Sequence, residues 1–126
     1  NISGKVVISK NYYLNNISSL ENNVTEIEAL IIIENTSLNS FTAFNNLETV
    51  NANIHFERSN IQNLNFLESL SIVNSRISFR LNNSLNDYCG IRTLLINNNF
   101  PEENFYCSEN LFNPTLQDMV DGNCSL

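Results

Sequence analysis

Residues 38–56, LNSFTAFNNLETVNANIHF, and residues 61–79, IQNLNFLESLSIVNSRISF, carry the same pattern of apolar side chains. In the first stretch apolar residues recur at every third position up to Val50 and then alternate up to Phe56. The second stretch repeats this pattern 23 residues later and ends at Phe79. Alternation indicates a strand with one buried face. The third-position spacing suits short 3₁₀ or irregular turns that direct one apolar side chain inward per turn.

The pattern continues in both directions with small changes of length. The alternating stretch Ile27–Ile33 lies 23 residues before its equivalent in the next repeat, and Ile2–Ile8 lies 25 residues earlier still. After Phe79 the repeat shortens, and Ile91–Asn99 is expected to form a last, degenerate strand. A period of this length indicates an array of stacked units.

We therefore predict a mainly β protein, a parallel β-solenoid of four to five rungs in one domain, residues 1–126. The rungs are expected over about residues 1–96 and a C-terminal cap over about residues 97–126. Each rung contributes side chains to a common interior, because a single unit of this kind cannot bury its own apolar face. The expected interior file consists of Ile8, Ile33, Phe56 and Phe79.

Composition and charge exclude several classes of function. The net charge is −7 with six basic residues and no basic run, whereas nucleic-acid binding needs clustered Lys and Arg. No apolar segment reaches the length of a transmembrane helix, so we expect no direct membrane insertion. The sequence has no phosphate-binding loop, no nucleophile elbow and no Cys/His spacing for zinc, so we expect no cofactor and no metal.

An enzyme is not expected either. Glu34 and Glu57 fall at equivalent positions of adjacent strands, a separation similar to that of the carboxylate pair in retaining glycosidases. The chain has no tryptophan, and no aromatic platform or loop insertion accompanies the two carboxylates. Two glutamates on a solvated sheet face are therefore the preferred interpretation.

Asparagine accounts for 26 of the 126 residues. Asn tolerates left-handed backbone and bonds to turns through its side chain, which suits the bends of each rung. Several asparagines also begin N-x-S/T sequences, the acceptor sites of N-glycosylation. If the protein is secreted, we expect glycans at the acceptors between strands, Asn16, Asn23, Asn35 and Asn82.

The three cysteines are Cys89, Cys107 and Cys124. A disulfide between Cys107 and Cys124 would close the C-terminal end of the stack, where an apolar surface needs a cap. Spacing alone does not prove this pairing. Cys89 would then be a buried thiol, an alternative partner for Cys107, or bonded to a segment outside this chain.

An apolar cluster is expected on the outward face of the strands. Val7, Leu30 and Ile32 occupy neighbouring outward positions among mostly polar residues, and such a cluster is a plausible partner-binding site. Asn53 and His55 would form its polar margin. Alternatively, a loop or an N-terminal cap covers the cluster. His55 is the only histidine, and a surface histidine is preferred to a catalytic or pH-sensing one.

The strand pattern resembles that of the receptor L domain. I-x-G-x-V-x-I at Ile2–Ile8 and L-x-x-V-x-A-x-I-x-F at Leu47–Phe56 are similar to rungs of that family, although later repeats replace the glycine with Ala or Ser. The segment Asn97–Cys124 is similar to its cysteine-containing C-terminal cap. The family comprises leucine-rich-repeat-like, right-handed modules of the insulin and EGF receptor ectodomains, and free-standing forms occur in nematodes.

The resemblance implies an extracellular, non-catalytic recognition module, either secreted or part of a cell-surface protein with a role in signalling. Its partner would be a protein or peptide ligand, or another receptor chain, held against the sheet face. The alternative is a structural or adhesion glycoprotein of a cell surface or coat.

Overall fold

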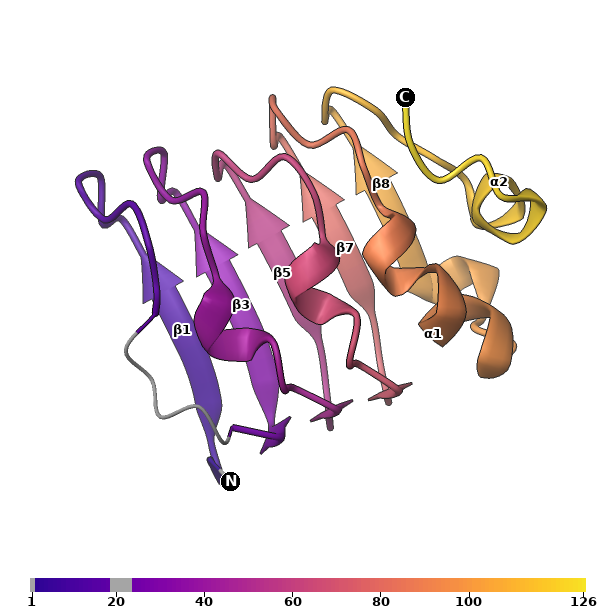
Figure 1. Ribbon diagram of the computed structural model, residues 1–126, viewed down its shortest axis with the longest axis horizontal. Coiled ribbons are helices and arrows are strands. Elements are labelled where there is room, and N and C mark those ends of the chain that lie inside the picture. The colour runs from indigo at the N-terminus through magenta and orange to yellow at the C-terminus, as the bar shows by residue number, and fades with distance from the viewer. Residues whose placement is uncertain (1, 19–23) are drawn as a thin grey trace.

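The computed structural model describes residues 2–18 and 24–126. Its main element is a five-stranded parallel sheet whose strands follow one another in the order of the chain (Figure 1). The strands are β1 (Lys5–Ser9), β3 (Ala29–Ile33), β5 (Ile54–Glu57), β7 (Ile77–Arg80) and β8 (Phe105–Ser108). Each strand pairs with its neighbours in parallel register, so successive repeats lie side by side.

A second, smaller parallel sheet is formed by short strands that come just before β3, β5 and β7 in the chain. It consists of the two-residue strands β2 (Glu26–Ile27), β4 (Thr49–Val50) and β6 (Ile72–Val73), in that order. The described residues thus form a mixed α/β architecture with eight strands in parallel sheets.

Short helical turns return the chain from one main strand to the next. Three of them are 3₁₀ turns: η1 (Thr42–Phe44), η2 (Asn65–Leu67) and η3 (Cys89–Ile91). They occupy the segments with third-position apolar spacing, which confirms the expected tight winding. All three lie on one face of the main sheet (Figure 1). No helix formed by residues 2–18 or 24–126 covers the opposite face of the sheet.

The C-terminal part adds α1 (Arg92–Asn97), η4 (Glu102–Asn104) and α2 (Leu116–Asp121). The prediction of a strand over Ile91–Asn99 was wrong, because most of this segment is the helix α1. The fifth strand is instead β8, which lies inside the expected cap and pairs with β7. A helix suits this position because Leu94 and Leu95 both turn toward the core, which a strand with alternating faces does not allow.

The core lies between the main sheet and the helical turns. Buried side chains join in one cluster that extends from Val24 to Cys124, and partly buried residues of the first repeat, such as Ile8 and Leu14, pack against it. Its centre is a file of aromatic rings: Phe41 stacks on Phe56 with ring centroids 5.7 Å apart, and Phe79 meets Phe56 edge-on at 5.6 Å. Aromatic contacts of this geometry add stability beyond the area they bury.

The second repeat has the opposite face assignment to the one expected. Leu30 and Ile32 are fully buried, whereas Ile31 and Ile33 point outward with intermediate exposure. Ile32, not Ile33, is the register partner of Ile8 and Phe56. The expected interior file was therefore wrong at Ile33.

The physical reason is a difference of one residue in the link between the two sheets. Ile27 pairs with Val50, and Leu30 pairs with Ile54. In the second repeat two residues lie between Ile27 and Leu30. In the third repeat three residues lie between Val50 and Ile54. A shift of one residue moves every following side chain to the other face of a strand.

One disulfide closes the C-terminal end of the molecule, between Cys89 and Cys124. The predicted pairing of Cys107 with Cys124 was wrong, because Cys107 is a free thiol in β8. Cys107 is the register partner of Phe79, whose side chain points inward, so its thiol faces the core beside Tyr88. Burial raises the pKa of the Cys107 thiol to about 12.

No helix among the described residues has the length and apolar character needed to cross a bilayer. The same residues include no group of three or more His, Cys, Asp or Glu side chains arranged to hold a metal ion.

Candidate recognition face

The face of the main sheet away from the helical turns presents one row of outward side chains across all five strands. Strand pairing fixes this row, because side chains of register partners point to the same side. The outward middle row is Val7, Ile31, His55, Ser78 and Tyr106. We call this surface the sheet face, defined by the outward strand positions, the outward residues Asn53 and Arg76 that precede β5 and β7, and the corner residue after each strand.

The N-terminal part of the sheet face contains a group of apolar side chains, flanked on β1 by the exposed Lys5 and Ser9. Val7 is 58% exposed, Ile31 lies next to it as its register partner, and Ile33 follows on the same side of β3. We call these three residues the apolar strip. It replaces the predicted cluster, which was wrong at Leu30 and Ile32 because both side chains are 0% exposed.

Val7, Asn53 and His55 do lie on the sheet face as expected. Asn53 precedes β5, and its Oδ1 accepts a hydrogen bond from the backbone N–H of Arg76 at 3.1 Å. His55 is the register partner of Ile31, so it borders the apolar strip. The structure thus places three of the five predicted partner-binding residues together on one surface.

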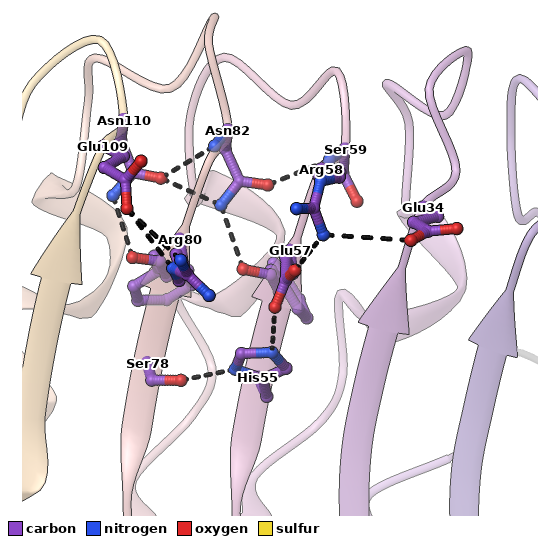
Figure 2. Close-up of polar contacts among 12 residues, drawn as sticks. Glu34, His55, Glu57, Arg58, Ser59, Ser78, Arg80, Asn82, Glu109 and Asn110 are labelled. Atoms are coloured by element: carbon purple, nitrogen blue, oxygen red, sulfur yellow. Dashed lines mark hydrogen bonds and ion pairs between the residues drawn. The ribbon is translucent and has the colours of Figure 1, made fainter.

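The centre of the sheet face is a hydrogen-bonded series of polar side chains (Figure 2). His55 Nδ1 lies 2.5 Å from Ser78 Oγ, and His55 Nε2 lies 3.3 Å from Glu57 Oε2. Glu57 also pairs with Arg58, whose guanidinium reaches Glu34 Oε1 at 3.8 Å. The two glutamates therefore share a cation on the sheet face rather than standing as a free carboxylate pair.

A serine hydrolase links a serine, a histidine and an acidic residue by hydrogen bonds, and the same residue types are linked here in Ser78, His55 and Glu57. Acyl transfer additionally needs donors directed at a developing oxyanion. The N–H groups of β5 and β7 lie in the plane of the sheet and donate to neighbouring strands; the N–H of Ile54, for example, donates to the carbonyl of Arg76 at 2.9 Å. The N–H of Ile54 is thus engaged within the sheet.

A shallow hollow of about 400 Å³ lies beside this series, between β3 and β8. Arg76 is exposed at its rim, and Tyr106, 51% exposed, contributes from β8. The full lining is Ile31, Asn53, Ile54, His55, Arg76, Ser78 and Tyr106.

The sequence alone did not single out Arg76, Ile31, Ile33 or Tyr106 as residues of this surface. Tyr106 was missed because β8 was not recognised as a strand. The alternation of Phe105 and Cys107 around it was the available indication.

A ladder of asparagines marks the corner after each main strand. Each strand is followed by a residue with positive φ, a conformation that side chains other than Gly, Asn and Asp rarely adopt. These corner residues are Lys10, Glu34, Arg58, Leu81 and Glu109. The residue after each corner is Asn11, Asn35, Ser59, Asn82 or Asn110.

Side-chain amides of the ladder bond to the backbone of the preceding repeat. Asn82 Nδ2 donates to the carbonyl of Phe56 at 3.0 Å, and its Oδ1 accepts from the N–H of Ser59 at 3.0 Å. Asn110 Nδ2 donates to the carbonyl of Phe79 at 2.9 Å. These bonds satisfy buried backbone groups that the corner conformation leaves without a ladder partner.

The ladder overturns two of the four predicted glycosylation sites. Asn35 and Asn82 are 0% exposed, and each uses its Nδ2, the atom that carries a glycan, to bond the backbone. Neither is available as an acceptor in this fold. Asn16 is exposed and stays a predicted site, whereas Asn23 lies outside the described residues.

Comparison with known proteins returns no match: no family model, no curated protein and no solved structure is significantly similar to this chain. The arrangement of the residues is therefore the only basis for a functional proposal.

Proposed function

We propose that the chain is a right-handed β-solenoid of the receptor L-domain type, with one rung for each strand of the main sheet. Support comes from the chain-ordered parallel strands and from the helical turn that follows each of β3, β5 and β7. The repeat of roughly two dozen residues, in which each unit contacts its neighbours, is typical of solenoids.

We propose that its function is to recognise a protein or peptide ligand through the sheet face, without catalysis. The observation that carries this proposal is the apolar strip, in which the exposed Val7 lies beside the partly buried Ile31, which lines the hollow together with His55 and Arg76. Interfaces between proteins combine an apolar centre with a polar margin in this way. A parallel sheet is a rigid support, so little conformational entropy is lost on binding.

An extracellular setting fits this function. The disulfide between Cys89 and Cys124 is of a kind that persists in oxidising compartments. The exposed Asn16 lies between β1 and β2 and forms a parallel bridge with Ser40, away from the outward row of strand residues, so a glycan there would leave the sheet face accessible.

The test is to select binders from a displayed random-peptide library and to measure their affinity for variants of the protein. Val7→Asp and Ile31→Asp should each weaken binding, because a carboxylate placed in an apolar contact loses its hydration. Ile72→Asp is the matched control: Ile72 is 42% exposed but belongs to β6, in the other sheet.

Equal binding to all three variants and to the unaltered protein would contradict recognition through the sheet face. A library that yields no binder would favour the alternative, a structural or adhesion glycoprotein whose sheet face has no ligand.

A further inference from the structure

The basic residues of this acidic protein gather on the sheet face. Five of the six lie at its outward or corner positions, together with three acidic residues, Glu34, Glu57 and Glu109. The other described positions carry a single basic residue, Arg92, and nine acidic residues. The five basic residues are Lys5, Lys10, Arg58, Arg76 and Arg80.

Two of these cations are neutralised within the face. Arg58 pairs with Glu57 and Glu34, and Arg80 lies 3.4 Å from Glu109. Arg76 differs from them, because no carboxylate among the described residues forms an ion pair with its guanidinium. The face thus leaves an uncompensated positive charge at the hollow.

The surroundings of Arg76 match the chemistry of carboxylate recognition. The guanidinium offers paired donors in a planar fork that suits the two oxygens of a carboxylate. Tyr106, 51% exposed, lines the same hollow and carries a further hydroxyl donor, whereas both ring nitrogens of His55 are engaged by Ser78 and Glu57. Ile31 also lines it, so the hollow joins the apolar strip without a break.

We propose that the occupant of the sheet face is an acidic, extended peptide segment of the partner, with a Glu or Asp carboxylate bound at Arg76 and a neighbouring apolar side chain on the apolar strip. This inference rests on the proposed function and specifies its ligand. Charge complementarity carries it: the rest of the surface repels an acidic segment, so long-range forces guide the segment to this one face.

The test uses a fluorescently labelled random copolymer of glutamate and tyrosine, followed by anisotropy at low and at physiological salt. The unaltered protein should bind it, more weakly as salt increases. A copolymer of glutamine and tyrosine should bind poorly, since it keeps the aromatic groups and lacks the charge.

Arg76→Gln should weaken the affinity for the acidic copolymer at least about tenfold, the usual effect of losing a charge-assisted hydrogen bond. Arg76→Lys should recover part of it, because an ammonium keeps the charge without the planar fork. Asn45→Asp changes the net charge by the same amount at an exposed residue after η1, on the helical side, and should leave the affinity nearly unchanged.

Failure of the unaltered protein to bind the acidic copolymer, or equal affinities for Arg76→Gln and Asn45→Asp, would overturn the proposal. Neither result would bear on whether library peptides bind the unaltered protein and bind the Ile31→Asp variant more weakly. The proposal of an acidic ligand can therefore fail while the proposal of recognition through the sheet face stands.

Discussion

The Oδ1 atom of Asn82 accepts a hydrogen bond from the backbone N–H of Ser59, 23 residues earlier in the chain, at 3.0 Å. Asn110 does the same for the N–H of Asn82, and Asn35 for that of Asn11. The repeats are thus joined at their corners by side-chain amides as well as by the strands. Ser59 is the one member of this ladder that is not an asparagine, and its buried Oγ has no hydrogen-bond partner among the described residues.

Ser59→Asn should stabilise the protein, because the new amide occupies the ladder position and can bond the backbone of the second repeat. We expect an increase of about 1 kcal/mol in the free energy of unfolding, the net value of a typical buried hydrogen bond. Urea denaturation followed by circular dichroism measures it. Ser3→Asn, at an exposed position, should change little, and a destabilised Ser59→Asn protein would show that the corner cannot accept the larger side chain.

Adjacent isoleucines of β3 should respond oppositely to the same substitution. Ile32→Asp should abolish cooperative folding, because Ile32 is 0% exposed and an unpaired carboxylate in the core costs several kcal/mol. Ile31→Asp should fold, with a free energy of unfolding lower by roughly 1 kcal/mol or less. Thermal melts of the two variants test the face assignment directly; a folded Ile32→Asp beside an unfolded Ile31→Asp would restore the assignment expected from the alternating pattern.

Removing the disulfide should destabilise the C-terminal end. Its cysteines are 35 residues apart in sequence, and closing a loop of that length in the unfolded chain is worth roughly 4 kcal/mol in the chain-entropy description. Cys89→Ala combined with Cys124→Ala should lose about this amount in denaturant melts. Dithiothreitol should lower the melting temperature of the unaltered protein but not that of the double variant.

A dithiothreitol effect that persists in the double variant would mean that Cys107, the cysteine left in that variant, is oxidised there by a bond to another molecule. Peptide mapping by mass spectrometry would identify its partner, and would show whether Cys124 bonds to Cys107 instead of Cys89.

Alkaline pH should weaken the fold through Cys107. Burial raises the pKa of this thiol from 9.0 to about 12, so the unfolded chain releases the proton at lower pH than the folded one. The contribution of the protonated Cys107 thiol to the free energy of unfolding is therefore complete below pH 9.0 and is lost as the pH rises toward 12. Burial likewise raises the pKa of the neighbouring Tyr88 hydroxyl, which adds to the loss in the same direction.

Urea melts across this pH range should show that the free energy of unfolding falls less with rising pH for Cys107→Ala than for the unaltered protein. The native thiol should also react slowly with iodoacetamide at pH 8, since the thiolate is the reactive form. Rapid alkylation without unfolding, or identical pH profiles for the two proteins, would contradict a thiol directed into the core.

The third and fourth repeats could be predicted from the sequence because their strands alternate polar and apolar residues. Ile54 and Phe56, like Ile77 and Phe79, are buried as the pattern indicates. The same rule failed over Ala29–Ile33, where five apolar residues follow one another and the pattern does not distinguish the two faces. The apolar strip was therefore predicted in the right region of the sheet, with the wrong side chains of β3.

The sequence by itself determined the repeat, the parallel strands and the tight turns between them, because all three follow from periodic local chemistry. Tertiary structure alone decided which isoleucines of β3 face outward, that Cys89 rather than Cys107 meets Cys124, and that Asn35 and Asn82 are buried. Each of these depends on where residues of different repeats meet in space. The link between β2 and β3 is one residue shorter than the equivalent link in the next repeat. This difference reverses the two faces of β3, although the local composition gives no sign of it.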